Sequence, residues 1–396
     1  MPSLPVILSV IKTEEYGSRL YSSPSPVAYL DRNEQLATFS HTFEEDELSY
    51  QANGRTPSRA LLRHLKSACK LAHEDGIPYM WSDIICASTH DLGRLSGEVN
   101  SMYGIYKWAE KCYAYLSDVT RLDELKSSKW FKMGWTLVQL VASREVIFLN
   151  KKGEEIARKS THQSILFSAT GIENMVLMNR TSLRNVCVAK RFSWAASRST
   201  VSEVNMAYCL ISLFGVSMDL EYNETLEAAF RRLQFKIMER FPDDLSIFAW
   251  ACQSSGDSNK SQLLARSPSD FANCEQVTIR RYPSYLKVPV WNRRLITSGS
   301  DGAHLNLPIL LKNNKCNIIL NCSLPQAPPH FICNSLQVIP RREEWEEEWA
   351  GQYEYIRFQR SGLEAVSDRT IQQDVTRLVD ECIYLRADGV AVPYRP

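Results

Sequence analysis

The sequence predicts an α/β protein with an open parallel sheet core, followed by an α-helical segment and a β-rich C-terminal part. Three observations lead to this prediction. Short apolar runs alternate with amphipathic stretches of helical length in the first third of the chain. Apolar stripes at helical spacing follow in residues 183–250. From about residue 277, short apolar runs are broken by Pro and Asn, which is typical of strand-rich domains.

The strands expected in the first third of the chain cover residues 36–40, 77–81, 112–116 and 146–149. A helix that opens at Pro57 and stops before Gly76 separates the first two strands. A second helix, with an apolar face from Val99 to Ala109, leads to the third strand, and residues 130–142 form a short helix before the fourth. Strands connected in this way pair in parallel, with helices on both faces of the sheet.

Polar residues follow the ends of the first three predicted strands: Ser40 and His41, then Asp83, then Asp118. In open parallel sheets, ligands bind beyond the carboxyl ends of the strands. We therefore expect these side chains to gather along one edge of the sheet. Adjacent side chains on a strand point to opposite faces, so the pair Ser40 and His41 is a poor candidate for a nucleophile and its base.

The domain organisation follows the changes of pattern along the chain. The stretch from Gln253 to Lys260 is polar and is expected to be a linker or loop. The expected parts are the α/β core at residues 33–160, a helical segment at 161–252, a linker at 253–276 and a β-rich region at 277–396.

Composition narrows the class of protein. Lys and Arg number 46 and Asp and Glu 45, so the net charge of +1 argues against a broad nucleic-acid-binding face. The 11 cysteines form no CxxC pair and their count is odd, which favours a reducing compartment. The 7 histidines show no metal-ligand spacing. With no apolar segment long enough to span a bilayer, we expect a cytoplasmic protein with no metal site and no membrane segment.

Several short stretches are similar to those of a known family. They are residues 39–50 (FSHTFEEDELSY), 79–86 (YMWSDIIC), 98–103 (EVNSMY), 112–119 (CYAYLSDV) and 130–137 (WFKMGWTL). They resemble, in order, the blocks of the fungal heterokaryon incompatibility (HET) domain. Residues 191–195, 206–210, 230–234 and 246–250 are similar to the helical segment that often follows this domain. The resemblance covers roughly residues 33–280.

The resemblance implies a cell-death effector of fungal self/non-self recognition. The core of HET proteins is thought to resemble the TIR fold, which is a flavodoxin-like open parallel sheet. TIR relatives either assemble as signalling adaptors or cleave NAD with a glutamate near the strand ends. On this basis we expect protein partners or self-association through the HET domain. NAD is a possible substrate, and no cofactor is assigned.

Two departures from the family pattern concern catalysis. Where the family has an arginine before Gly-Trp, this chain has Met133, and where it has Gln-Glu after Trp-Thr-Leu, this chain has Val138 and Gln139. Glutamine keeps the hydrogen bonds of glutamate but loses its charge. Methionine removes the guanidinium fork. We therefore expect weak or absent catalysis and a role in assembly.

Three functional hypotheses stay open. The first is the non-catalytic effector, the second is a NAD glycohydrolase that relies on Asp83 or another carboxylate, and the third is a decayed copy without a role. Asp83 has a structural interpretation as well, because Asp is favoured at helix N-caps. Residues expected at a ligand-binding edge are Ser40, His41, Trp135 and Gln139. The indole of Trp135 is equally an expected core group, since tryptophan buries a large area.

Overall fold

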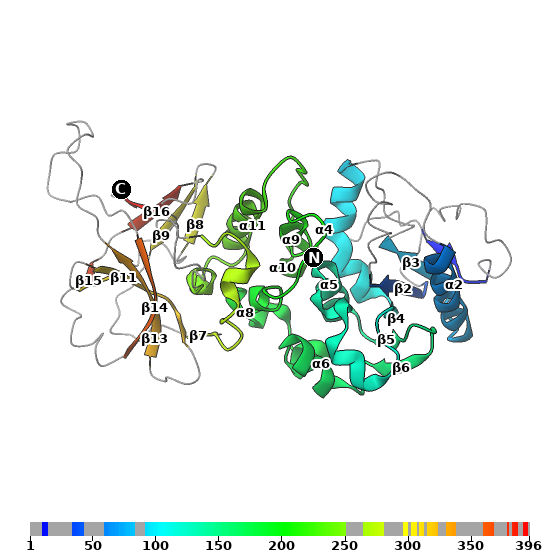
Figure 1. Cartoon of the computed structure of the whole chain (residues 1–396). Coiled ribbons are helices and arrows are strands. Elements are labelled where there is room, and N and C mark those ends of the chain that lie inside the picture. The colour runs from blue at the N-terminus through cyan, green and yellow to red at the C-terminus, as the bar shows by residue number, and fades with distance from the viewer. Residues whose placement is uncertain are drawn as a thin grey trace. The chain divides into compact units, whose positions relative to one another are not determined.

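The computed structural model describes residues 10–14, 34–42, 59–83, 92–250 and 264–280, together with strands between residues 296 and 394 (Figure 1). The strands cover 296–299, 302–306, 309–312, 315–319, 322–323, 330–337, 359–367, 378–379, 382–386 and 391–394. Contacts divide the chain into two units. The first unit is Met1–Leu183 with Arg198–Asn223, and the second is Arg184–Ser197 with Glu224–Pro396. Residues 253–263 of the predicted linker lie outside the described residues.

The first unit contains a sheet with helices around it. Its elements are β1 (Ile11–Lys12), β2 (Leu36–His41), α2 (Arg59–Glu74), β3 (Tyr79–Ser82), α4 (Leu92–Trp108), β4 (Lys111–Tyr115), η2 (Leu122–Ser127), η3 (Lys129–Lys132), α5 (Gly134–Ala142), β5 (Val146–Leu149), β6 (Glu155–Arg158), α6 (Gln163–Thr170), α7 (Asn174–Leu177), α9 (Asn205–Tyr208) and α10 (Ile211–Phe214). The structure is therefore mixed α/β, as predicted.

The sheet of the first unit has six strands in the order β1-β3-β2-β4-β5-β6. The strands β3, β2, β4 and β5 are the predicted ones, and they pair in parallel. Their residues are buried almost throughout, as expected for parallel strands covered on both faces. The edge strands β1 and β6, which pair antiparallel, were not predicted. The first has only two residues, too few to give a pattern.

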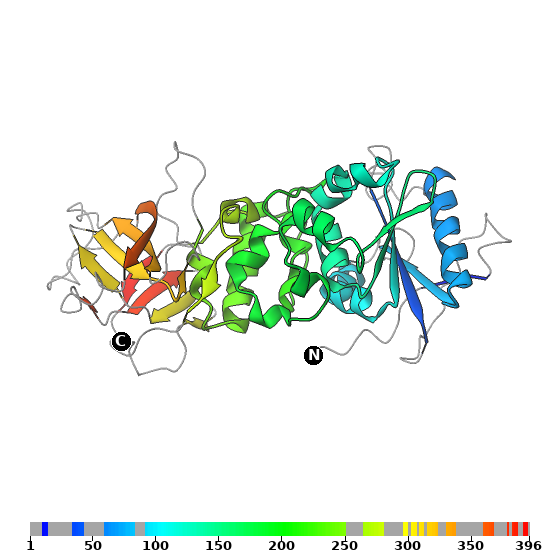
Figure 2. The same cartoon turned by 90° about the horizontal axis from the view of Figure 1, so that it is seen from below.

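Helices cover both faces of this sheet. Helix α2 lies on one face, and α4 and α5 lie on the other (Figures 1 and 2). On the α4 side, the ring of Trp81 meets that of Tyr106 edge-on, with the centroids 5.7 Å apart. On the α2 side, His64 stacks on Tyr115 with the centroids 3.7 Å apart. The two faces of the sheet therefore give their side chains different surroundings.

The single helix predicted over residues 130–142 is wrong in one respect. The structure has two elements there, η3 and α5, separated by Met133 in an extended conformation (φ −89°, ψ 138°). A distant segment causes the break. The amide of Gly134 donates to the carbonyl of Ser199 at 2.8 Å, and the amide of Ser199 donates to the carbonyl of Lys132 at 2.8 Å. These bonds replace the helical bonds that a continuous helix would make.

The same segment carries Arg198 to the start of α5. Its side chain is buried, and Nη1 donates to the carbonyl of Met133 at 2.9 Å and to Oγ1 of Thr136 at 3.1 Å. Burial lowers the pKa of this guanidinium to about 10, so it stays charged at neutral pH. Arg198 thus joins residues far apart in the sequence within the first unit.

The second unit combines helices with antiparallel strands. Its helices are α8 (Val188–Ser193), α11 (Leu226–Arg240), η5 (Leu245–Phe248) and η6 (Pro268–Phe271), and η4 (Leu183–Asn185) crosses the boundary. Its strands are β7 (Thr278–Ile279), β8 (Ile296–Gly299), β9 (Gly302–Asn306), β10 (Ile309–Lys312), β11 (Lys315–Ile319), β12 (Cys322–Ser323), β13 (His330–Gln337), β14 (Gln359–Ser367), β15 (Leu378–Val379), β16 (Cys382–Arg386) and β17 (Ala391–Tyr394). They form sheets in the orders β14-β13-β11-β10-β15, β17-β16-β9-β8 and β12-β7.

A buried arginine, Arg191, contacts other elements in the helical part of the second unit. The guanidinium of Arg191, on α8, lies 4.5 Å from the centroid of the Phe241 ring. The carboxylate of Asp244 accepts a hydrogen bond from the amide of Val188 at 2.9 Å, at the start of the same helix. Arg191 and Asp244 also attract each other electrostatically. This arrangement fixes α8 within its unit.

Candidate functional site

A buried polar cluster lies between the sheet and α5, and it contains two of the predicted ligand-binding residues. The hydroxyl of Ser40, on β2, donates to Oε1 of Gln139, on α5. The indole Nε1 of Trp130 donates to Oγ of Ser40 at 2.7 Å. Ser40 is 1% exposed and Gln139 is 2% exposed. The Ser40 hydroxyl, the Trp130 indole N–H and the amide oxygen of Gln139 therefore find hydrogen-bond partners inside the protein.

Local structure explains how these side chains meet. Ser40 and Thr38 point to the same face of β2 because they are two residues apart. Gln139 lies in a helix whose residues from Thr136 to Ala142 are all buried, so its amide has to find a partner inside. The ring of Trp130 is held edge-on against Phe148, with the centroids 5.6 Å apart. This contact aims the indole nitrogen at the end of β2.

Asp83 lies on the same face and at the same edge as Ser40. Strands β2 and β3 run in parallel with Phe39 opposite Ser82, so the next residues, Ser40 and Asp83, take neighbouring positions. Asp83 is half-buried. Burial raises the pKa of Cys112 to about 12, and the negative charge of Asp83 contributes to this rise. The structure therefore brings Ser40, Asp83 and Gln139 to one face of the sheet near its carboxyl edge.

His41 and Trp135, the other predicted ligand-binding residues, have different surroundings. The His41 ring is buried on the α2 face, parallel to the Phe39 ring at 6.0 Å between centroids. Its neighbour in the register of β4 is Tyr115, on which His64 stacks. Trp135 is half-buried and lies one helical turn before Gln139 on α5. The sheet thus separates His41 from the cluster that contains Ser40.

The carboxyl edge of the sheet is tied together by residues just beyond the strands. The hydroxyl of Thr42 donates to the carbonyl of Tyr115 at 3.3 Å and accepts from the amide of Ser117 at 3.0 Å. Asp118, predicted to lie at this edge, accepts from Oγ of Ser128 at 2.8 Å and from the amide of Lys129 at 2.6 Å. It therefore binds the start of η3, the element that carries Trp130. The sequence pattern did not predict this role, because the contact depends on how the chain turns back between Asp118 and Ser128.

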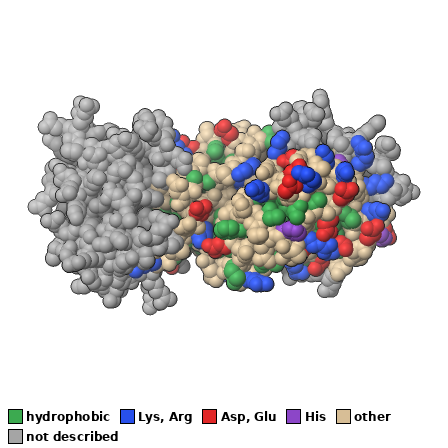
Figure 3. Space-filling view, turned by 60° about the horizontal axis from the view of Figure 1, so that its bottom comes forward, with side chains coloured by type: hydrophobic (Ala, Val, Ile, Leu, Met, Phe, Trp, Pro, Cys, Tyr) green, Lys and Arg blue, Asp and Glu red, His purple; other side chains and the backbone are tan. Residues whose placement is uncertain are grey.

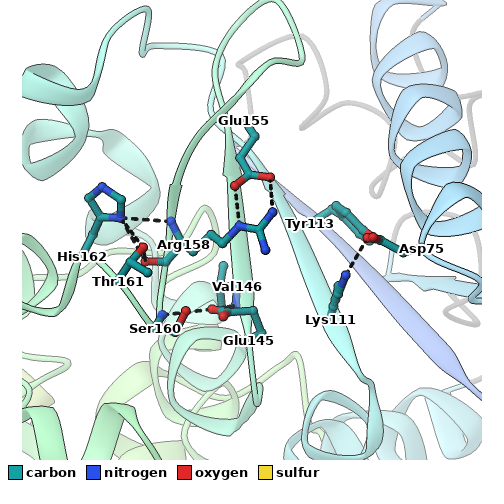
Figure 4. A network of polar contacts seen from close by, with 10 residues as sticks. All are labelled: Asp75, Lys111, Tyr113, Glu145, Val146, Glu155, Arg158, Ser160, Thr161 and His162. Carbon is teal, nitrogen blue, oxygen red and sulfur yellow. Dashed lines mark hydrogen bonds and ion pairs between the residues drawn. The ribbon is translucent and has the colours of Figure 1, made fainter.

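A second polar network lies at the opposite edge of the sheet, where β4 begins (Figure 4). The Tyr113 hydroxyl donates to the Asp75 carboxylate, and Lys111 Nζ lies 2.8 Å from the same carboxylate. Burial raises the pKa of Asp75, but the bonds from Lys111 and Tyr113 outweigh burial and bring it below its ordinary value. This network fastens the end of α2 to β4, and it is remote from the edge at which the strands end.

Lys159, just after β6, is a fully buried lysine. Its Nζ donates to the carbonyl of Ser143 at 2.5 Å. Burial lowers its pKa to about 8, although the charges of Glu145 and Cys112 act in the other direction. The ammonium group is therefore largely charged at neutral pH inside the protein, which costs stability.

We expect Lys159→Met to stabilise the fold at neutral pH and to change its pH dependence. With a pKa of about 8 when folded and an ordinary value of 10.5, the lysine binds fewer protons in the folded chain between these values. The free energy of unfolding of the wild type therefore increases as the pH rises from about 8 to 10.5. Below this range, burial of the charged lysine lowers the free energy of unfolding by at most ~3 kcal/mol. Part of this cost is offset by the hydrogen bond to Ser143, which methionine lacks.

Urea unfolding of both chains at a series of pH values measures this effect. The difference between the variant and the wild type should shrink between pH 8 and pH 10.5. The thiol of Cys112, whose pKa is raised, titrates in the opposite sense, but it is present in both chains and so cancels to first order. A difference that stays constant over this range would show that the lysine is not held as described.

The described residues give no sign of two other kinds of site. No helix in the described part of the chain is long and apolar enough to cross a membrane. Among the same residues, no three His, Cys, Asp or Glu side chains gather as a metal ion would require.

Comparisons with known proteins locate a family in the first unit. The model of the heterokaryon incompatibility protein (HET) family matches residues 33–131, and that of a domain of unknown function (DUF8212) matches residues 228–260. A curated relative, the vegetative incompatibility protein HET-E-1 of Podospora anserina, is 32% identical over 216 residues. The alignment covers 51% of this chain and 16% of that protein. No solved structure matches the chain.

The HET match contains most of the cluster described above. Ser40, Asp83 and Trp130 fall within residues 33–131, whereas Gln139 lies just beyond the end of the match. This chain spans about a sixth of the length of the curated relative, since the alignment covers 16% of it. Three observations agree on a HET domain in the first unit: the order of the quoted sequence blocks, the parallel core, and the matches to the family model and to the curated relative. Residues 33–131 of this chain are therefore assigned to the HET domain.

Proposed function

We propose that this protein acts in the cytoplasm in fungal self/non-self recognition and programmed cell death, as a non-catalytic module that works by assembly with protein partners or with copies of itself. The relative's name, vegetative incompatibility protein, supports the biological role. The observation that carries the non-catalytic assignment is the buried bond between Ser40 and Gln139.

The chemistry of that cluster argues against catalysis. Cleavage of a glycosidic bond needs a carboxylate near the ribose, where positive charge develops. Gln139 carries no charge, and its oxygen already accepts a hydrogen bond from Ser40 within a closed interior. The position that is glutamate in the resembling family therefore serves in this chain to join α5 to β2.

The strand order supports a TIR-like, flavodoxin-like core. Counted along the chain, the parallel strands β2, β3, β4 and β5 are arranged with the second outside the first and with the third and fourth on the other side. This is the start of the flavodoxin-like order, whose ligand site lies between the first and third strands. Here that place is between β2 and β4. We further propose that the HET core covers residues 33–160 and the helical segment residues 161–252, followed by a linker at 253–276 and a β-rich region at 277–396.

Expression in a fungal host tests the proposal. We expect the wild-type chain and Asp83→Asn to arrest growth equally, because neither depends on a catalytic carboxylate. Asp123→Asn, at an exposed carboxylate on η2, is the matched control. The purified wild type is expected to release no nicotinamide from NAD. Absence of growth arrest by the wild type would contradict the cell-death role.

A NAD glycohydrolase is the second candidate, and one observation favours it. Asp83 is half-buried at the carboxyl edge of β3, beside Ser40, where a ligand of an open parallel sheet would bind. This candidate requires nicotinamide release by the wild type and its loss in Asp83→Asn, with Asp123→Asn unaffected. That result would replace the assembly proposal.

A further inference from the structure

The break between η3 and α5 occupies hydrogen-bonding groups that a continuous helix would use differently. In a helix, the amide of Gly134 would donate to the carbonyl of Trp130, and the carbonyl of Lys132 would accept from the amide of Thr136. Here the Gly134 amide donates to Ser199, and the Lys132 carbonyl accepts from Ser199. The carbonyl of Trp130 accepts from the hydroxyl of Thr136 instead. The Gly134 amide and the two carbonyls therefore have partners in either arrangement.

The local sequence favours the continuous arrangement. Residues 130–142 carry apolar side chains at helical spacing and no proline. The element η3 is a 3₁₀-helix of four residues, and such pieces within a helical stretch are common as hinges. What keeps η3 and α5 apart is the segment from Arg198 to Thr200, which we call the latch. Its middle residue, Ser199, pairs with Met133 as an isolated parallel bridge.

A chain of hydrogen bonds leads from the latch to the cluster around Ser40. Nη1 of Arg198 donates to Oγ1 of Thr136 at 3.1 Å, and this hydroxyl donates to the carbonyl of Trp130. The indole of Trp130 donates to Ser40, whose hydroxyl donates to Gln139. Because Trp130 lies on η3 and Gln139 on α5, the contact of both with Ser40 depends on the angle between these two elements.

Burial of Arg198 makes the latched arrangement costly. The Lys and Arg side chains coloured blue in Figure 3 reach the surface, whereas Arg198 is 7% exposed. Its guanidinium pays a desolvation penalty, which the hydrogen bonds to Met133 and Thr136 offset. Withdrawal of the latch would return this charge to water. That gain offsets part of the bonds that the latch loses, as a two-state element requires.

The latch is joined to the second unit by a short connection. The chain passes from the second unit to the first between Ser197 and Arg198. Helix α8 ends at Ser193 and is held within its own unit, where Asp244 accepts from the amide of Val188. The residues between α8 and the latch, 194–197, span at most about 14 Å when fully extended. A larger shift of α8 away from the first unit therefore displaces Arg198.

We propose that the second unit controls the cluster around Ser40 through this latch. In the latched state, η3 and α5 stay apart and Trp130 binds Ser40. When α8 shifts, Arg198 is withdrawn, η3 and α5 join into one helix, and Trp130 leaves Ser40. The carboxyl edge at which Asp83 also lies is then open. The latch goes beyond the proposed function, since it sets the state of this edge whether the module assembles or cleaves a substrate.

Nuclear magnetic resonance of the full chain tests the latch. Met133 and Gly134 form the only Met–Gly pair in the sequence, so isotope labels on methionine carbonyl carbons and glycine nitrogens give one correlated signal. The carbonyl shift in this signal distinguishes an extended Met133 from a helical one. We expect the extended signal alone in the wild type. In Arg198→Met, which removes the hydrogen bonds of the guanidinium, we expect a helical signal of at least equal intensity.

Three further variants separate the latch from a general loosening of the fold. Arg158→Met, at an exposed arginine paired with Glu155 on β6, is the matched control and should keep the wild-type signal. Asp244→Ala frees the start of α8 and should add a smaller helical signal. Gln234→Ala disturbs the second unit elsewhere, because it removes two hydrogen bonds to Ala265, and should add none.

Several results would overturn the latch. They are an extended Met133 in Arg198→Met, a wild-type signal in Asp244→Ala, and equal helical signals in Asp244→Ala and Gln234→Ala. Unfolding midpoints show whether each chain is folded. If the first two variants are not, Arg198→Lys, which keeps the charge without the planar fork, and Asp244→Asn replace them.

The indole signal of Trp130 tests the release of Ser40 separately. This signal is identified by its loss in Trp130→Phe. It should move in Arg198→Met toward the position of an indole in water and stay in place in Arg158→Met. An indole signal that does not move while Met133 becomes helical would overturn the proposed opening of the edge.

Discussion

Replacing Gly134 with alanine is expected to lower the free energy of unfolding by about 2–3 kcal/mol, at the upper end of what overpacking costs. A Cβ at this position would lie 2.6 Å from Cγ2 of Thr200 and 3.0 Å from both Sγ of Cys209 and Sδ of Met206. The backbone cannot retreat freely, because the amide of Gly134 is bonded to the carbonyl of Ser199. The glycine in the quoted stretch of residues 130–137 is thus required by the close approach of a distant segment.

A second glycine provides the matched control. Gly97 lies within α4, and a Cβ there would meet nothing within 4 Å. Gly97→Ala should therefore stabilise the chain by up to ~1 kcal/mol through helix propensity. Adding Thr200→Ser to Gly134→Ala removes the nearest methyl group and should restore part of the loss, which a double-mutant cycle in urea would measure. Equal stability of the two alanine variants would contradict the close packing at Gly134.

Substituting Gln139 is expected to have the other large effect. Gln139→Leu leaves the buried hydroxyl of Ser40 without its acceptor, and an unsatisfied buried group costs about 1–3 kcal/mol. The indole of Trp130 still donates to Oγ of Ser40 in this variant, so the cost comes from the lost acceptor of the Ser40 hydroxyl. Urea unfolding should show the decrease. A variant as stable as the wild type would mean that the cluster contributes no stability.

Gln139→Glu should make the stability of the chain depend on pH. Burial raises the pKa of a carboxyl group, so the glutamic acid would be neutral at low pH and would resemble the amide it replaces. As pH rises above the ordinary glutamate pKa of about 4.3, the unfolded chain loses its proton before the folded chain does. Stability therefore falls with rising pH until the folded pKa is passed.

The control for that pH dependence is Gln163→Glu, at a half-buried position on α6 whose side chain bonds to the carbonyl of Ser160 at 2.9 Å. Its carboxylate would reach water and should titrate close to its ordinary pKa, with little change in stability. Unfolding curves of the two variants at several pH values make the comparison. A Gln139→Glu chain with the same pH profile as the control would show that the cluster admits water.

The sequence was sufficient for the parallel core because the pattern of each strand is local. Buried parallel strands are continuous apolar runs, and the amphipathic helices between them leave only one common way of pairing. That reasoning placed residues 36–40, 77–81, 112–116 and 146–149 in one sheet, and it put Ser40 and Asp83 at the same edge. It failed at Met133, because the break in the helix there depends on Ser199.

What the sequence by itself determined is the class of the core, the order in which strands and helices follow one another, and the family, because all of these are written in short stretches of residues. Only the tertiary structure decided the roles of single side chains. Whether Gln139 faces water or accepts a bond from Ser40, and whether Gly134 has room for a methyl group, depends on segments dozens of residues away. Local patterns carry no information on such contacts, since the two partners meet only when the chain has folded.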